Sequence, residues 1–342
     1  MKTGKISESI LKRSVLRQIK THNEKVVKGA GVGEDCAFLS WGNAEDISLS
    51  CTEKTEKEVA VSTQTVTLPA ADSAYLAVMA AANNLWAAGA VPAAVTLAVT
   101  LPEEAGEELL KELMGQAQRC CEQLQMQIAG GHTEVSRAVK WPVVTATAVG
   151  MKAASADEPQ TDHEASRLDI VVSKWIGMEG TSIIAREKES ELLSRYPAHL
   201  ISMAQEQKDC LSIASEAAIA LKSGVYTMHD VRNGGIFGAL WEVSRKLGVG
   251  LYIDLKKIPV RQETIEVCEF YNLNPYELLS GGSLIMLTQK GQELAEKLEE
   301  AGIAASVIGS TNDGNDKLIA NQDEIRYLEP PVPDEIYKIA FI

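Results

Sequence analysis

The chain of 342 residues lacks the features typical of secreted, membrane-bound or nucleic-acid-binding proteins. No stretch reaches the roughly 20 apolar residues of a membrane span, and the first 20 residues lack the apolar core of a signal peptide. Lys and Arg number 33 against 47 Asp and Glu, and a net charge of −14 argues against a large nucleic-acid footprint. We therefore expect a cytoplasmic protein with neither nucleic acid nor membrane as a partner, although an acidic chain can still bind ATP locally.

Cysteine-based scaffolds are also missing from the sequence. None of the six cysteines forms a C-x-x-C pair, and their spacing gives no regular framework for disulfides or zinc. We expect reduced cysteines that serve as packing residues. They are Cys36, Cys51, Cys120, Cys121, Cys210 and Cys268.

Length and hydrophobic pattern predict two domains of mixed α/β structure. A chain this long, with 45% hydrophobic residues, has enough material for two cores. The polar stretch 154–167 has the composition of a linker, so we expect domains at 1–155 and 165–342. Predicted strands alternate with predicted helices, which favours an α/β or α+β sandwich. The expected helices are 71–90, 103–127, 180–186, 207–222, 235–247 and 292–302, and the expected strands are 93–101, 143–151, 168–175, 283–288 and 304–309.

Two segments of the first half combine backbone freedom with polar side chains. GAGVGEDCAFL, residues 29–39, places three glycines before Glu34 and Asp35 and then an apolar strand, which suits close approach to a ligand but also an ordinary surface turn. Asn83 and Asn84 end a small, apolar helix, where they either bond neighbouring backbone or face a ligand.

A third segment, AGGHTEVS at 129–136, follows a short strand with a predicted turn. Its His132 either bonds nearby backbone or contacts a ligand.

Two segments of the second half could contact a phosphate. MHDVRNGGIFGALWEVSRKLGVGL, residues 228–251, reads as a polar loop with two glycines that leads into an amphipathic helix, whose first N–H groups can hold a phosphate. Lys174 ends a predicted strand before a glycine turn, so it is either a solvated lysine or a point charge on a phosphate.

The order of these segments resembles the HypE family of hydrogenase-maturation proteins, within the aminoimidazole-ribonucleotide (AIR) synthetase-related superfamily. Residues 29–39 are similar to its Gly-Asp-Asp-Ala-Ala turn, and residues 72–102 to its helix-and-strand segment. GGHT, residues 130–133, is similar to its GGDT turn, and HDVRNGGIFGAL to its HDPTRGGLATAL segment. The resemblance spans roughly residues 30–310.

This resemblance implies an AIR-synthetase-like fold: an N-terminal half-barrel domain that dimerises, and a C-terminal α/β sandwich domain that closes over ATP and Mg²⁺. The matching positions are Glu34, Asp35, Gln64, Asn84, His132 and Asp230. The turns around them complete our set of candidate nucleotide-contacting residues, adding Gly130, Gly131, Thr133, Lys174, His229, Asn233, Gly234 and Gly235. No catalytic residue is assigned.

The sequence departs from the family pattern where a metal ion would bind. Gln64, Asn84 and His132 stand where the family has aspartate, and neither an amide nor an imidazole replaces the carboxylate charge that Mg²⁺ prefers. We expect at most a weak metal site at Glu34 and Asp35. Alternatively, Gln64, Asn84 and His132 hydrogen-bond one another and a bound water, and leave metal binding at these two acids undiminished.

Two further departures concern the second half. Asn233 takes the place of the family's arginine before the paired glycines, with Arg232 one position earlier. The sequence also ends at 338–342 without the family's terminal cysteine, so we do not expect the cyanide-forming reaction by that route.

Three hypotheses follow. The first is a HypE-like hydrogenase-maturation-factor paralogue that binds ATP or a related nucleotide, with a degenerate Mg²⁺ site and altered or lost chemistry. The second is an active ATP-dependent enzyme of the same fold that uses Glu34, Asp35 and Asp230 on an unknown small substrate. The third is a non-catalytic dimeric scaffold for a maturation partner.

Overall fold

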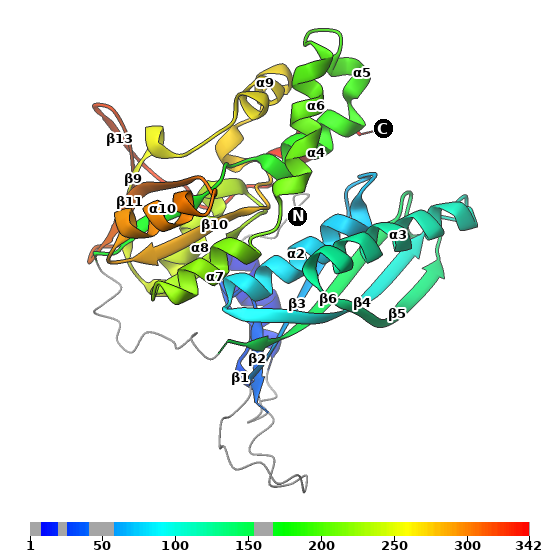
Figure 1. Ribbon diagram of the computed structural model, residues 1–342, viewed down its shortest axis with the longest axis horizontal. Coiled ribbons are helices and arrows are strands. Elements are labelled where there is room, and N and C mark those ends of the chain that lie inside the picture. Colours follow the sequence, from blue (N-terminus) through cyan, green and yellow to red (C-terminus); the bar gives the residue numbers. More distant parts are fainter. Residues whose placement is uncertain (1–7, 20–25, 41–57, 154–166, 342) are drawn as a thin grey trace, which may run out of the picture. The chain divides into compact units, whose positions relative to one another are not determined.

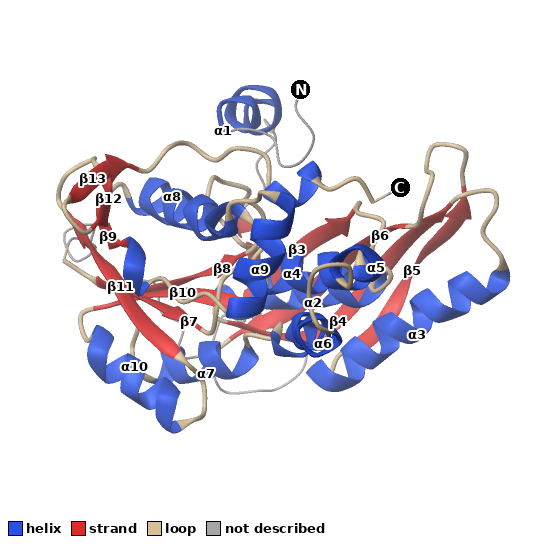
Figure 2. Ribbon diagram, turned by 90° about the horizontal axis from the view of Figure 1, so that it is seen from above, coloured by secondary structure: helices blue, strands red, loops and turns tan. Residues whose placement is uncertain are grey.

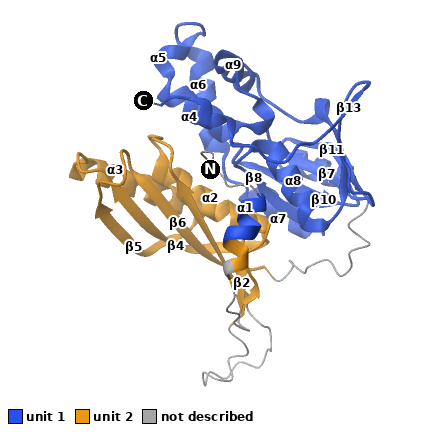
Figure 3. Ribbon diagram, turned by 180° about the vertical axis from the view of Figure 1, so that it is seen from behind, with its two compact units in different colours: residues 1–14, 157–342 blue, residues 15–156 orange. Residues whose placement is uncertain are grey.

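The computed structural model describes residues 8–19, 26–40, 58–153 and 167–341, and it divides the chain into two compact units (Figure 3). Residues 15–156 form one, here called the N-terminal unit, and residues 157–342 with 1–14 form the other, the C-terminal unit. Each has a β-sheet with helices packed on it, which confirms the predicted α/β class. The predicted linker falls almost wholly outside the described residues.

The N-terminal unit is a six-stranded sheet in the order β1-β2-β3-β6-β4-β5 (Figure 1). Neighbouring strands run antiparallel except for the parallel pair β4 and β5. The strands are β1 (Val26–Lys28), β2 (Ala37–Ser40), β3 (Glu58–Val66), β4 (Ala90–Leu101), β5 (Gln127–Val135) and β6 (Val143–Lys152).

Both long helices of this unit lie on one face of the sheet (Figure 1). Helix α2 (Ser73–Ala87) packs on β3, β4 and β6, and its small side chains are nearly all buried; α3 (Glu107–Leu124) packs on α2 and β5. Side chains of a strand alternate between the two faces, and in β6 Val144, Ala146 and Ala148 are fully buried beneath the helices. The residues between them face away from the helices.

The C-terminal unit is built on a seven-stranded sheet in the order β13-β12-β9-β11-β7-β10-β8. Its strands are β7 (Asp169–Ser173), β8 (Thr227–Val231), β9 (Gly250–Asp254), β10 (Ser283–Thr288), β11 (Ala305–Asn312), β12 (Lys317–Asn321) and β13 (Glu324–Tyr327). Every residue of β10 is buried, as expected of a strand covered on both faces.

Helices cover both faces of this second sheet (Figure 2). Helix α8 (Gly235–Leu247) packs its apolar side into the main core with alternate residues of β7, β9 and β10. On the other face, α10 (Gly291–Glu300) contacts β7 and β11, and α7 (Ala214–Lys222) contacts β10. The remaining helices are α4 (Met178–Glu187), α5 (Glu189–Leu192), α6 (Ala198–Glu206), α9 (Gln262–Tyr271) and the short α1 (Glu8–Ile10). No helix in the described part of the chain is long and apolar enough to cross a membrane.

Four predicted elements need correction. The helix predicted from 103 begins at Glu107, because Pro102 opens a turn closed by a hydrogen bond from Ala105 N–H. The turn predicted at 129–136 is the edge strand β5, and the start of the loop predicted at 228 is strand β8.

The fourth is the helix predicted over 207–222. It is divided into a 3₁₀ turn, η5 (Gln207–Cys210), and α7, with residues 211–213 between them. The carbonyls of Cys210 and Ser212 accept hydrogen bonds from the ammonium of Lys174 instead of continuing a helical ladder.

Candidate functional site

The glycine-rich turn is joined to strand β3 and helix α2 by a chain of buried polar groups. Ser62 Oγ donates to the carbonyl of Asp35 at 3.1 Å and accepts from Asn84 Nδ2 at 2.9 Å. Cys36 Sγ lies 3.1 Å from the carbonyl of Asn84. All three side chains, Cys36, Ser62 and Asn84, are less than 10% exposed. The structure therefore brings together Asp35 and Asn84, two residues that lie 49 positions apart in the chain.

Ser62 was not predicted from the sequence. Its only signal is its position two residues from Ala60 and from Gln64 on β3, which places all three on the face covered by α2. Its hydroxyl is both donor and acceptor, so it can couple a turn to a helix, which an apolar residue could not.

The two carboxylates of the turn differ in their surroundings. Glu34 pairs with Lys28 of β1 at 3.0 Å, at a partly exposed position. Gly33, immediately before it, has φ of 74°, a left-handed conformation that glycine adopts without strain. The turn thus presents Glu34 beside a cation and ties Asp35, through its backbone, to the buried polar groups.

The side chains near this turn suit an Mg²⁺ ion poorly. Two carboxylates, Glu34 and Asp35, stand beside an amide and a hydroxyl, and Asn84 directs its amide nitrogen, a donor, at Ser62. No group of three or more His, Cys, Asp or Glu residues in the described ranges is arranged to hold a metal ion. Mg²⁺ prefers anionic oxygen ligands in near-octahedral geometry.

His132 lies apart from these residues. Across the sheet it is in one row with Ala98, Thr145 and Thr65, and the hydroxyls of Thr145 and Thr65 bond each other at 2.9 Å on the face that the helices leave uncovered. His132 shares that face, whereas Gln64 lies on the helix-covered face of β3. Strand β5 is three places from β3, which separates the two residues by roughly 14 Å at about 4.8 Å per strand.

His132 therefore cannot hydrogen-bond Gln64 within one chain, as one alternative required. His132 is 73% exposed, and its Nε2 lies 3.5 Å from a carboxylate oxygen of Glu134. Its neighbours Gly130, Gly131 and Thr133 also lie on the exposed edge strand.

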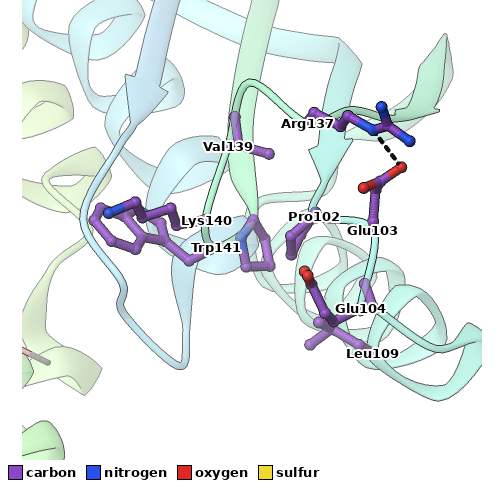
Figure 4. A pocket seen from close by; sticks show the side chains of 10 residues that line it. Pro102, Glu103, Glu104, Leu109, Arg137, Val139, Lys140 and Trp141 are labelled. Carbon is purple, nitrogen blue, oxygen red and sulfur yellow. Dashed lines mark hydrogen bonds and ion pairs between the residues drawn. The ribbon is translucent and has the colours of Figure 1, made fainter.

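A hollow of about 860 Å³ lies elsewhere in the N-terminal unit (Figure 4). It is bounded by the turn before α3 and by the connection from β5 to β6, which are joined by a 2.9 Å contact between Arg137 and Glu103. Trp141 forms part of the wall and donates to the carbonyl of Thr67 at 2.8 Å. None of the residues predicted to bind a nucleotide lines it.

In the C-terminal unit, His229 and Asp230 are buried neighbours on strand β8 and so point to opposite faces. His229 Nε2 lies 3.1 Å from a carboxylate oxygen of Glu242 on α8. Asp230 acts electrostatically on Arg232, which forms a two-pronged bond with Glu179 at 3.1 and 2.9 Å. Burial lowers the pKa of Arg232, but Glu179 and Asp230 outweigh it, so that pKa is raised.

The paired glycines after Asn233 use their N–H groups within the chain. Gly234 N–H donates to Asp334 Oδ2 at 2.6 Å, and Gly235 N–H donates to the carbonyl of Arg232 at 3.1 Å. Gly235 has φ of 62°, and a Cβ there would lie 2.4 Å from the carbonyl of Tyr276. The N–H groups that were predicted to contact a phosphate at this helix start thus already donate to acceptors within the chain.

Lys174 also bonds within the chain. Its ammonium donates to the carbonyls of Cys210 and Ser212 at 2.8 and 2.6 Å and pairs with Glu216 at 2.5 Å. Two of the three donors of this ammonium have carbonyl acceptors, and its charge is paired with Glu216. A phosphate contact by Lys174 stays a prediction. It would require the ammonium to exchange at least one of these protein acceptors for a phosphate oxygen.

Comparison with protein families identifies both units. Residues 33–152 match the N-terminal domain of AIR synthase related proteins, and residues 169–320 match the C-terminal domain of the same proteins. The chain belongs to the AIR synthase-related family.

Several proteins similar to this AIR synthase-related chain carry names from hydrogenase maturation. A protein of Methanocaldococcus jannaschii named for hydrogenase expression and formation is 24% identical over 98% of this chain and 97% of its own length. The structure of a HypE–HypF complex matches with a TM-score of 0.72 at 20% identity, over 94% of this chain and 99% of the other. HypE in complex with ATP matches with a TM-score of 0.68 at 18% identity, over 98% and 97%. These likenesses confirm the predicted HypE-like, AIR-synthetase-like fold.

Proposed function

We propose that this AIR synthase-related protein binds ATP or a related nucleotide at the glycine-rich turn of its N-terminal unit, as a HypE-like maturation-factor paralogue with a degenerate Mg²⁺ site. The observation that carries the proposal is the buried connection from Asp35 through Ser62 to Asn84. It ties the backbone of Asp35 to α2 through Ser62, so that the backbone of the turn is positioned before a ligand arrives. A HypE structure with ATP, which covers nearly the whole chain, supports the choice of nucleotide.

The first prediction concerns the metal dependence of nucleotide binding. We expect Mg²⁺ to increase the ATP affinity of the wild-type protein little, because Gln64, Asn84 and His132 carry no negative charge where the family pattern that the sequence resembles has aspartate. Replacing Gln64, Asn84 and His132 by aspartate is expected to restore the Mg²⁺ dependence. Each net gain of roughly 1.4 kcal/mol in binding free energy would raise the ATP affinity in the presence of Mg²⁺ about tenfold. Isothermal titration of ATP with and without Mg²⁺ measures it.

The structure allows a sharper version of this titration. Gln64 and Asn84 lie on the helix-covered side of the sheet, whereas His132 lies on the open face. The double variant Gln64→Asp, Asn84→Asp therefore tests the site of one chain, and an added effect of His132→Asp would assign that residue to the site of a second chain. Strong Mg²⁺-dependent ATP binding by the wild type would contradict the degenerate site.

ATP turnover separates this proposal from its two alternatives. Turnover with Mg²⁺ or Mn²⁺ that Asp35→Ala removes would establish an ATP-dependent enzyme. Binding without turnover supports the proposal. If the protein shows no ATP binding and no turnover, a scaffold for a maturation partner is favoured. The structure of a HypE–HypF complex is a precedent for such a partner.

The second prediction is that two copies associate through the open face of the N-terminal sheet. This face carries the threonine pairs Thr63–Thr147 and Thr65–Thr145 and exposed apolar residues that include Val91 and Met151. Soluble proteins rarely leave such a face and an edge strand uncovered, and cyclic dimers are the commonest assembly. Light scattering at micromolar concentration should give twice the mass of one chain.

A charge placed on this face should dissociate the dimer. We expect Thr147→Arg to give monomers, because the guanidinium would be buried without a partner. Gln118→Arg, on the exposed side of α3, is the matched control and should leave the mass unchanged. A wild-type monomer would refute the assembly, and a dimeric Thr147→Arg protein would place the interface elsewhere.

A further inference from the structure

The first described residues of the chain are held on helix α8 of the C-terminal unit by one carboxylate. Glu8 Oε2 accepts the indole N–H of Trp241 at 3.1 Å, and Oε1 accepts from Arg245 Nε at 3.2 Å. Trp241 and Arg245 are one helical turn apart, so they lie on the same side of α8. Lys12 Nζ also bonds Oε1, at 2.5 Å. Three donors therefore meet at one side chain, of which 21% is exposed.

The surface around Glu8 is rich in positive charge. Lys317 Nζ lies 4.9 Å from the centroid of the Trp241 ring. Burial lowers the pKa of Lys317, and the charge of Arg245 lowers it further, whereas Glu8 raises it. Burial raises the pKa of Glu8, but the bonds from Lys12 and Trp241 and the charge of Arg245 outweigh it, so that pKa is lowered. Glu8 is therefore held as an anion by the cations that surround it.

The other residues of the N-terminal segment add little to this attachment. Helix α1 has only three residues, and residues 11–18 continue it as short π- and 3₁₀-helical turns. No residue from 8 to 17 is buried, and Val15 and Ile19 are 43% and 51% exposed. Because a segment with few buried apolar contacts opens at low free energy, the polar bonds of Glu8 decide whether this one stays docked.

The same segment leads to a strand beside the glycine-rich turn. Residues 1–14 belong to the C-terminal unit and residues 15–156 to the N-terminal unit, so the chain passes from one unit to the other shortly after the anchor. Strand β1 has three residues, lies at the edge of its sheet and pairs with β2. It ends at Lys28, whose ammonium is 3.0 Å from Glu34 of the turn. Such a short edge strand is easily displaced by the chain that precedes it.

We propose that residues 8–19 form a strap, anchored by Glu8, through which the C-terminal unit controls strand β1 and the placement of Lys28 beside Glu34. With the anchor made, β1 stays on β2 and Lys28 neutralises Glu34. When the anchor opens, β1 loosens, and the uncompensated carboxylate of Glu34 repels a triphosphate at the turn. This last consequence rests on the proposed nucleotide site, whereas the strap itself does not.

Hydrogen exchange and ATP titration of Glu8→Gln test the strap. The amide keeps the size of the side chain but removes its charge, so amides of residues 8–19 should exchange about tenfold faster. Amides of residues 26–28 should also exchange faster, because β1 is no longer restrained. ATP should bind about threefold more weakly, the size of effect expected from one partly exposed ion pair.

Three comparisons show whether the charge of the anchor is responsible. Salt at about 1 M should speed the exchange of residues 8–19 in the wild type but change it little in Glu8→Gln, because salt screens exposed charges. Trp241→Phe keeps an aromatic ring beside Lys317 but removes the N–H, so it should have a smaller effect than Glu8→Gln. Glu300→Gln, at an exposed position of α10, is the matched control and should behave as the wild type.

Lys28→Gln separates the anchor from its consequence. It should weaken ATP binding as Glu8→Gln does, but leave the exchange of residues 8–19 unchanged. Wild-type exchange at 8–19 in Glu8→Gln would overturn the anchor, and faster exchange there without a change at 26–28 would overturn the strap. Faster exchange at both with unchanged ATP affinity would overturn the control of the turn. If the wild type binds no ATP, the proposed nucleotide site fails, and exchange at 8–19 and 26–28 still decides the strap.

Discussion

Replacing Arg232 by alanine should lower the free energy of unfolding by about 3–5 kcal/mol, the range for breaking a buried ion pair from one side. The two-pronged bond from Arg232 to Glu179 is almost completely enclosed, with 10% and 3% of the two side chains exposed. Without the guanidinium, the buried carboxyl group of Glu179 would lose its cation. Chemical denaturation of the purified variant measures the loss.

Two comparisons show whether the unpaired charge is the cause. The double variant Arg232→Met, Glu179→Gln removes both charges and should be more stable than Arg232→Ala, since no carboxylate is left alone. Arg195→Ala breaks an exposed pair with Glu269 at 3.2 Å and should cost less than about 1 kcal/mol. If Arg232→Ala costs no more than Arg195→Ala, the buried pair does not stabilise the fold as argued.

Replacing Lys174 by alanine is expected to have an effect of the same size, about 3–5 kcal/mol. The loss would leave Glu216, 3% exposed, without its cation, and the carbonyls of Cys210 and Ser212 without their donor. The segment between η5 and α7 would lose the bonds that hold it, so hydrogen exchange should rise there first.

Nucleotide titration of the same variant separates the two roles considered for Lys174. If Lys174 has only a structural role, we expect Lys174→Ala to be less stable but to bind ATP with unchanged affinity when folded. If Lys174 contacts a phosphate, we expect the variant to bind ATP more weakly. The double variant Lys174→Met, Glu216→Gln should recover part of the stability in the first case. Lys222→Ala, at the exposed end of α7, is the control and should change stability by no more than about 0.5 kcal/mol.

The structure places the predicted site residues in different surroundings. Asp35 and Asn84 were expected to act together, and the structure joins them through a serine that the sequence did not single out. His132 follows a glycine pair that reads locally as a turn, and only its pairing with β4 shows that it is on an edge strand. Lys174 was predicted to be either solvated or in contact with a phosphate, and the paired glycines were predicted to hold one. Both bond within the chain in the structure, and their contact with a phosphate stays a prediction.

The sequence by itself determined the α/β class, the family resemblance and the principal helices, because these depend on local periodicity and on the order of short motifs along the chain. Helix α8, for example, starts and stops at the glycines that the sequence displays. Only the tertiary structure decided which groups meet. Arg232 finds Glu179 across 53 residues and Gly234 finds Asp334 across 100. Such partners are set by the order of the strands in the sheet and by the path of the chain near its C-terminal end. The hydrophobic periodicity of strands, with period two, and of helices, with period 3.6, carries no information about the strand order or about this path.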